Sequence, residues 1–73
     1  MAEKPVSFPP SRNIAAIMYD DETQTLTVDF QKGGRCVYYE VDEGTVNGFG
    51  QALSATKYLN AYIENQFPQE RAW

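Results

Sequence analysis

The chain has 73 residues, 42% of them hydrophobic and 14% aromatic, which supplies apolar material for one small domain and leaves no room for a second core. It contains no apolar run of the ~18 residues that a membrane helix needs and no basic-then-apolar leader, so we expect a cytoplasmic protein without a membrane span. Ten acidic residues against six basic ones give a net charge of −4, which disfavours nucleic-acid binding unless cations gather locally.

Two residue types limit the chemistry. The chain has no histidine, so it lacks the usual general base near neutral pH and the commonest metal ligand. Cys36 is the only cysteine, which excludes an internal disulfide and is typical of a small buried hydrophobe. The carboxylates of Asp20 and Asp21 suit turn chemistry, and with Glu22 they lack the spaced ligands of a calcium loop. We therefore predict a non-enzymatic monomer without metal or cofactor.

The N-terminal stretch MAEKPVSFPPSRN carries prolines at positions 5, 9 and 10. Proline fixes φ and pushes the preceding residue toward extended geometry, so residues 1–13 are predicted to form an extended arm rather than a helix. The apolar side chains of Val6 and Phe8 can pack on the arm's own domain or on a partner. The sequence leaves these two alternatives open.

Residues 14–41 predict a three-stranded antiparallel meander with turns at 20–22 and 32–34. The first strand, over residues 14–19, is apolar on both faces, so its orientation stays ambiguous. The middle strand alternates cleanly between an apolar and a polar face, which is typical of an antiparallel strand with one wet face. Its apolar face consists of Leu26, Val28 and Phe30.

The third strand lies in RCVYYEV and contains two adjacent tyrosines. Its alternation puts Val37, Tyr39 and Val41 on one face, and apolarity predicts that this face meets the core. Tyr38 would then lie on the opposite, open face beside Glu40.

Two helices are predicted to follow. Asp42 suits an N-cap, and an apolar spacing of helical period continues to about residue 53. Ser54 is a second N-cap candidate, and the helix that it begins would end before Pro68. Residues 68–73 are predicted to be a polar tail that ends in Trp73. The apolar helical stripes consist of Val46, Phe49, Ala52 and Leu53, and of Tyr58, Leu59, Tyr62 and Ile63, with Phe67 as a further member.

The predicted fold is therefore α+β, with a three-stranded antiparallel meander covered by two C-terminal helices (β-β-β-α-α). A proline-rich arm over residues 1–13 precedes a single domain over residues 14–67, and the polar tail follows it.

From about residue 11 to residue 63 the chain resembles the KTSC family, a small domain named for its occurrence at the C-terminus of some lysyl-tRNA synthetases. The family pattern runs roughly S-x-x-I-x-x-I-G-Y-D…L-x-V-x-F-x-x-G and continues to a Y-x-Y strand and S-x-G-x-Y-F-N. The resemblance implies a stand-alone domain of bacterial or phage origin. The positions that this chain supplies to the pattern are Ser11, Ile14, Ile17, Tyr19, Asp20, Leu26, Val28, Phe30, Gly33, Tyr38, Val41, Ser54, Tyr58 and Asn60, with Leu59 in place of the phenylalanine.

The chain departs from this pattern at three places. Met18 and Thr56 stand where the family has glycine, and Cys36 replaces the first tyrosine of Y-x-Y. The family has been thought to bind RNA, and only Tyr38 of the tyrosine pair remains here.

In size, acidity and N-terminal arm the chain also resembles a small phage-encoded regulator that binds bacterial RNA polymerase, inhibits initiation and favours antitermination. This resemblance implies a non-enzymatic protein-binding regulator in the host bacterial cytoplasm. The arm would dock extended against a groove or sheet edge, since prolines lower its ordering entropy. Removal of residues 1–10 would then abolish partner binding while the fold survives. The predicted partner-binding residues are Val6, Ser7, Phe8, Pro9, Ser11 and Arg12.

The alternative is single-stranded RNA binding on the sheet, with a tyrosine for base stacking and cations for phosphates. It predicts affinity that falls steeply with salt. The residues assigned to this alternative site are Tyr38, Arg35, Lys32 and Lys57.

Overall fold

The computed structural model describes residues 3–64 and 66–72, so Trp73 lies outside the described residues. One antiparallel sheet has the strand order β1-β2-β3-β4-β5, in which every strand pairs with its neighbours in sequence order. The α+β class is confirmed, and the predicted meander forms its three central strands. The strands are β1 (Glu3–Pro5), β2 (Ile14–Asp20), β3 (Thr25–Phe30), β4 (Arg35–Tyr38) and β5 (Gln69–Ala72).

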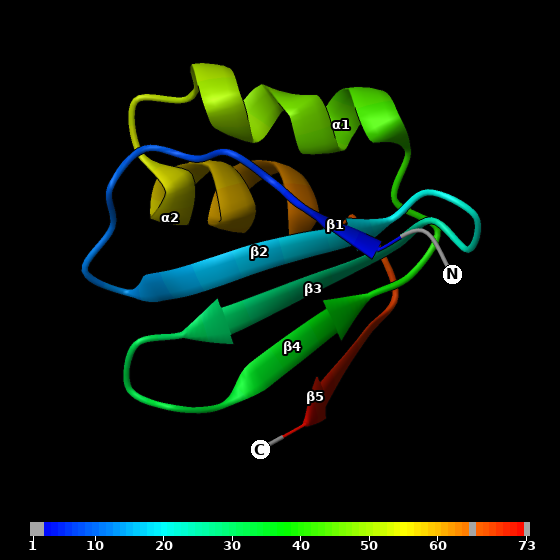
Figure 1. The fold of residues 1–73 in the computed structure, drawn as a ribbon, viewed down its shortest axis with the longest axis horizontal. Coiled ribbons are helices and arrows are strands. Elements are labelled where there is room, and N and C mark those ends of the chain that lie inside the picture. Colours follow the sequence, from blue (N-terminus) through cyan, green and yellow to red (C-terminus); the bar gives the residue numbers. More distant parts are fainter. Residues whose placement is uncertain (1–2, 65, 73) are drawn as a thin grey trace.

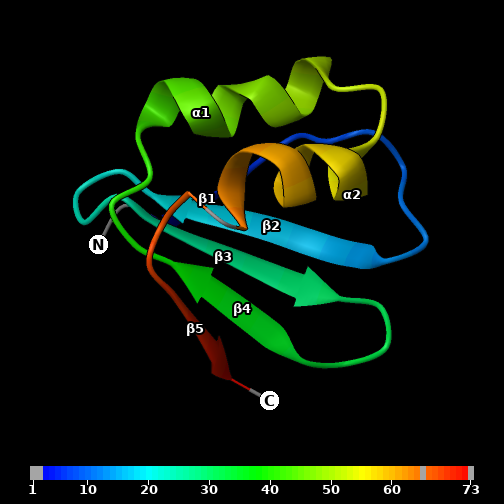
Figure 2. The ribbon, with the colours of Figure 1, turned by 180° about the vertical axis from the view of Figure 1, so that it is seen from behind.

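Two helical segments lie between β4 and β5 and cover one face of the sheet (Figures 1 and 2). Each begins at the predicted cap, because the side chains of Asp42 and Ser54 accept hydrogen bonds from the backbone N–H of Thr45 and Lys57. Each also changes geometry along its length. The segments are α1 (Glu43–Asn47) with the 3₁₀ turn η1 (Gly48–Gln51), and α2 (Ala55–Tyr58) with the π-helical turn η2 (Leu59–Ile63).

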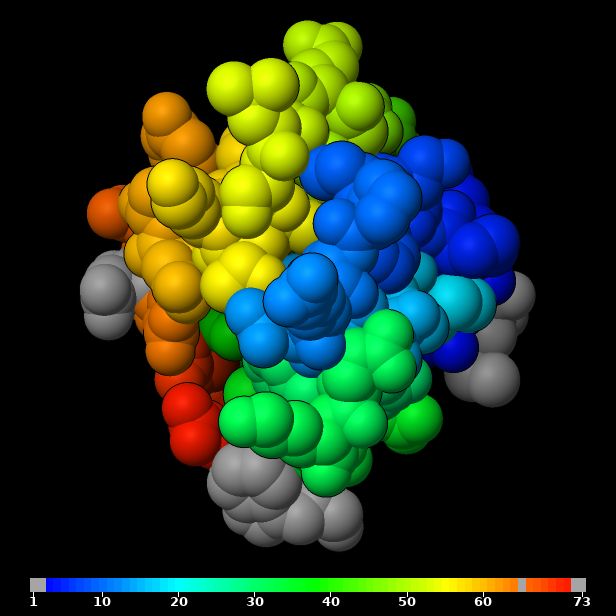
Figure 3. All heavy atoms as spheres, turned by 90° about the vertical axis from the view of Figure 1, so that its left-hand side faces the viewer, coloured from blue at the N-terminus to red at the C-terminus, as the bar shows by residue number. Residues whose placement is uncertain are grey.

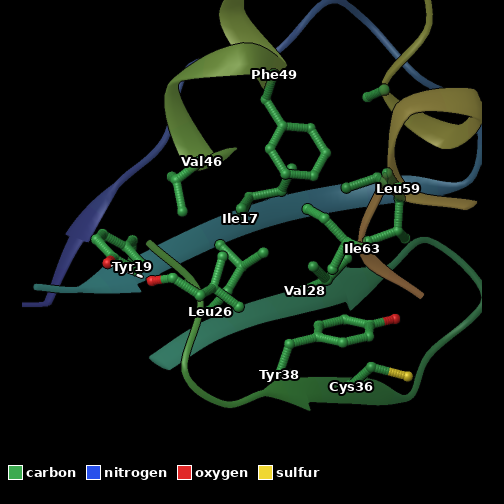
Figure 4. Close-up of a cluster of buried hydrophobic side chains, with 13 residues drawn as sticks. Ile17, Tyr19, Leu26, Val28, Cys36, Tyr38, Val46, Phe49, Leu59 and Ile63 are labelled. Carbon is green, nitrogen blue, oxygen red and sulfur yellow. Dashed lines mark hydrogen bonds between the residues drawn. The ribbon is translucent and has the colours of Figure 1, made fainter. Parts of the chain in front are cut away.

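The core lies between the sheet and the helices (Figure 4). Two buried isoleucines of β2 are three positions apart, and both reach the core because a register shift between Ile14 and Ala16 interrupts the alternation. The buried hydrophobic residues are Ile14, Ile17, Tyr19, Leu26, Val28, Cys36, Tyr38, Val41, Val46, Phe49, Ala55, Leu59 and Ile63.

The prediction for the third strand is wrong about its faces. Tyr38 is only 1% exposed, whereas Tyr39 is 37% exposed on the open face. Register with β3 explains this, because Leu26 lies opposite Tyr38 and directly paired residues share a face. Val41 still reaches the core, since Glu40 adopts a positive φ of 62° that changes the alternation.

Both ends of the chain add strands that the three-stranded prediction lacks. The predicted polar tail pairs as β5 with β4, from Tyr38 opposite Gln69 to Arg35 opposite Ala72. The predicted arm pairs as β1 with the end of β2, and the Val6 N–H extends this ladder with a 2.9 Å bond to the Ile17 carbonyl. Short polar runs at chain ends carry no alternation, so only the neighbouring strand decides that they pair.

The two predicted turns are confirmed. Asp20 Oδ1 accepts hydrogen bonds from the N–H groups of Glu22 and Thr23 in the first turn. In the second, Gly33 and Gly34 adopt φ values of 91° and 97°, which side chains with a Cβ rarely tolerate.

Candidate functional site

The N-terminal segment packs against its own domain. Val6 and Phe8 are partly buried against the core, and Pro9 and Ser11 are half-buried, while Ser7 and Arg12 are exposed. The Ser11 hydroxyl accepts hydrogen bonds from two following N–H groups, at 3.1 Å each, and so fixes the turn into β2. Of the six predicted partner-binding residues, Val6, Phe8 and Ser11 therefore support the fold, and Ser7 and Arg12 are exposed.

Three segments that are distant in sequence meet at one end of the sheet, which Figure 3 views directly. The Gln31 N–H donates to the Asn13 carbonyl at 2.9 Å. The Asn13 side-chain amide donates to Thr56 Oγ1 at 3.4 Å, and the Ser11 and Thr56 hydroxyls share a hydrogen bond at 3.3 Å. We call this surface, formed by residues 7–13, 31–34 and 51–57, the loop end.

An open hollow of 690 Å³ lies beside the loop end, between η1 and the α2–η2 segment. Its rim carries two exposed apolar side chains, Leu53 at 102% and Tyr62 at 59% exposure. The residues that line it are Gly48, Gln51, Ala52, Leu53, Ser54, Lys57, Tyr58, Ala61 and Tyr62.

Tyr58 forms part of the wall of this hollow. Its hydroxyl donates to the Thr45 carbonyl at 2.6 Å, and its ring lies 4.8 Å from the ring of Phe49 and 4.9 Å from that of Tyr62, centroid to centroid. Burial raises the pKa of Tyr58, so the phenol stays a hydrogen-bond donor. The hollow therefore has a fixed aromatic wall rather than a mobile one.

Leu53 and Tyr62 belong to the apolar helical stripes of the sequence, yet both side chains are exposed in the structure. Leu53 directly precedes the N-cap Ser54, where an apolar residue commonly packs against the fourth residue of the helix, here Tyr58. Leu53 is fully exposed instead, so this hydrophobic staple does not form. An apolar residue just before an N-cap was the signal that could have drawn attention to this position.

The structure does not assemble the alternative RNA site on the sheet. Tyr38 is buried beneath the helices, and this burial raises the pKa of its phenol (Figure 4). Arg35 Nε donates to Asp29 Oδ1 at 2.6 Å, and this bond raises the pKa of the guanidinium. Lys32 and Lys57 belong to the loop end, and the buried ring of Tyr38 offers no surface for base stacking.

The described residues assemble no metal site, and their one thiol is enclosed. Among residues 3–64 and 66–72, no three histidine, cysteine or acidic side chains are grouped as metal ligands. Cys36 is buried within the core. The Asp42 carboxyl has a pKa below its usual value because the Thr45 hydroxyl and N–H donate to it, which is the chemistry of a helix cap. None of the helices formed by the described residues has the length and apolarity needed to cross a membrane.

Fold and surface together define a small α+β domain with a five-stranded antiparallel sheet, one helix-covered face and an apolar hollow at its loop end. The profile of the KTSC domain matches residues 10–67. The chain therefore belongs to the KTSC domain family.

Solved and curated relatives agree with this membership. The crystal structure of a KTSC domain protein from Yersinia pestis superposes with a TM-score of 0.85 at 24% identity, covering 99% of this chain and 100% of that one, which shows a shared fold. Lysine–tRNA ligases from Nostoc punctiforme and Nostoc sp. are 28% and 31% identical over 67 residues, or 92% of this chain. The chain spans only 12% of the length of these ligases.

Proposed function

We propose that this protein is a non-enzymatic, phage-encoded regulator that binds bacterial RNA polymerase in the host cytoplasm, inhibits initiation and favours antitermination. The observation that carries protein binding is Leu53, a fully exposed leucine on the rim of a preformed hollow. Fully burying a leucine contributes about 1.5–3 kcal/mol, which this chain leaves unused in the free state.

The N-terminal segment supplies the polar part of the proposed surface. Ser11 links it to Thr56, and Ser7 and Arg12 are exposed residues of the loop end. Because the segment is already held by β1 pairing and by the partly buried Phe8, little chain entropy is lost on docking. This differs from a flexible arm that orders only when it meets the partner.

The test is binding of the full chain to purified bacterial RNA polymerase, with and without nuclease, by biolayer interferometry. We expect binding that resists nuclease and weakens by about 10-fold or more in Leu53→Ser, a change that removes no core contact. Tyr39→Ser is the matched control, because it removes an apolar side chain from the open face of the sheet. In vitro transcription should show reduced initiation and increased readthrough of terminators.

Absence of polymerase binding at micromolar protein would refute the proposed partner. Equal binding by Leu53→Ser and the wild type would instead place the contact elsewhere on the domain. Recovery of polymerase that disappears on nuclease treatment would favour the RNA alternative.

A further inference from the structure

Charge is segregated between the two ends of this domain. Three cations lie at the loop end, each next to a member of its hydrogen-bonded chain: Lys32 follows Gln31, Arg12 precedes Asn13 and Lys57 follows Thr56. All three are exposed. Among the residues that the structure describes, none of the three cations forms an ion pair with a carboxylate.

Most of the ten acidic residues lie at the opposite end, around the β2–β3 turn, the start of α1 and β1. The Val41 N–H bonds to the Gln24 carbonyl at 2.9 Å and brings the chain before α1 against that turn. Lys4 lies there too, with its Nζ 3.4 Å from Asp21 and 3.8 Å from Glu43. The acidic residues of this end are Glu3, Asp20, Asp21, Glu22, Glu40, Asp42 and Glu43.

Distance keeps the two charged ends independent. β2 runs from the loop end to the acidic end, and its seven residues span roughly 20 Å at about 3.3 Å per residue. The Debye length at physiological ionic strength is about 8 Å, so the carboxylates do not cancel the potential at the loop end. A domain with a net charge of −4 therefore presents one locally basic surface.

We propose that the loop end binds an acidic protein surface that carries an apolar side chain. Arg12, Lys32 and Lys57 face the partner's carboxylates, and the partner's apolar group enters the hollow beneath Leu53. This proposal rests on the proposed function, because it takes the loop end as a protein-binding surface, and it adds the chemistry of the surface that is bound. The acidic end repels the same partner, so charge also sets the orientation of docking.

The apolar part of this surface favours a protein over a nucleic acid. A single strand of RNA is held by phosphate contacts and by stacking on aromatic rings. The loop end offers it three cations and the adjoining hollow offers the half-exposed Tyr62, while Leu53 would stay in water. A polyanion longer than the basic surface would also extend toward the carboxylates at the other end. A compact acidic and apolar protein surface uses all of these groups.

The test combines charge reversals with defined probes. The variants Arg12→Glu, Lys32→Glu and Lys57→Glu are compared with Lys4→Glu, which makes the same change in net charge at the acidic end. The probes are bacterial RNA polymerase, a short peptide of acidic, leucine and phenylalanine residues, the same peptide with lysine in place of its acids, and single-stranded oligouridylate. Backbone amide shifts of the ¹⁵N-labelled full chain locate each small probe.

We expect each loop-end reversal to weaken polymerase and acidic-peptide binding by about 3- to 10-fold, with Lys4→Glu within about twofold of the wild type. The acidic peptide should shift amides of residues 11–13, 31–34 and 53–58, and the lysine peptide should not.

Each outcome separates the two proposals. If polymerase binds the wild type and the loop-end reversals equally, the acidic-partner inference is overturned and the proposed function stands. If polymerase does not bind but the acidic peptide shifts the amide signals of the loop end, the proposed function is overturned and the acidic-partner inference stands. Tighter binding of oligouridylate than of the acidic peptide, or no shift at the loop end with either, overturns the inference.

Discussion

Replacing Gly48 by alanine tests the packing that shapes the hollow. A Cβ at this position would overlap the phenol of Tyr58. The glycine is not needed for its backbone, because φ is −61° and ψ is −23°, an ordinary helical conformation. The ring cannot easily move away, since its hydroxyl bonds to the Thr45 carbonyl at 2.6 Å and the ring packs in a tilted contact with Phe49.

The change in the free energy of unfolding is the sum of one stabilising and two destabilising contributions. Alanine is more favourable than glycine in a helical backbone by about 1 kcal/mol. Overpacking costs about 1–3 kcal/mol, and loss of the Tyr58 hydrogen bond costs about 0.5–1.5 kcal/mol. We therefore expect Gly48→Ala to lower the free energy of unfolding by roughly 1–3 kcal/mol.

Gly50→Ala is the matched control in the same 3₁₀ turn. Its Cβ would meet only the Ser7 carbonyl oxygen, at an ordinary 3.7 Å, so this variant should be as stable as the wild type or more stable by up to about 1 kcal/mol. Urea unfolding followed by circular dichroism gives both values. Equal stability of the two alanine variants would refute the close approach of Gly48 and Tyr58. Adding Tyr58→Ala should abolish most of the extra cost of Gly48→Ala, because the double-mutant cycle removes the clashing ring.

Three further variants test other parts of the fold. Tyr19→Phe should cost about 1–3 kcal/mol in urea unfolding, because the buried Val41 carbonyl loses its 2.6 Å hydrogen bond; no change would mean that another donor reaches it. Phe8→Ala should lower the free energy of unfolding by about 1–3 kcal/mol, since the segment packs against the core. An unchanged midpoint of urea unfolding would mean that residues 1–13 form an arm that does not stabilise the domain. The capped Asp42 carboxyl has a pKa lowered from 3.8 by Thr45, so its stabilisation is present above that pH and is lost as the pH falls through the folded pKa. The unfolding temperature of the wild type should therefore fall relative to that of Asp42→Asn only below pH 3.8.

Local signals predicted the parts of the fold that depend on nearby residues. The middle strand alternates in sequence and in burial, with Leu26 and Val28 both completely buried. The caps at Asp42 and Ser54 need only the three residues that follow them. Elements with such short-range causes can be read from a single sequence.

The faces of β4 could not be predicted in this way. Val37, Tyr39 and Val41 are together more apolar than Cys36, Tyr38 and Glu40, so composition favoured the wrong phase. The choice follows from pairing with a strand whose inward face is already fixed, and a slip of one residue would invert it. The same limit applies to β1 and β5, which pair only because an unpaired strand edge lies beside them.

The candidate site was predicted in part. The segment around Ser11 and Arg12 was singled out for its prolines and its apolar Val6 and Phe8, and in the structure it lies at the loop end. The hollow was missed because helical spacing placed Leu53 in an apolar helical stripe, whereas the chain leaves helical geometry just before that residue. Long-range contacts, rather than composition, bring residues 13, 31 and 56 together.

Other surfaces of the sheet are less suited to a partner than the loop end. The edge strand β1 has three residues and ends in Pro5, and the other edge, β5, carries Glu70 and Arg71. Short, charged or proline-containing edges are the devices by which sheets avoid pairing with other chains. On the open face, Arg35 is engaged by Asp29 and Glu70 by the Tyr39 hydroxyl. The loop end instead combines an apolar hollow with three exposed cations that form no ion pair within the described part of the chain, and so binding there breaks no such ion pair.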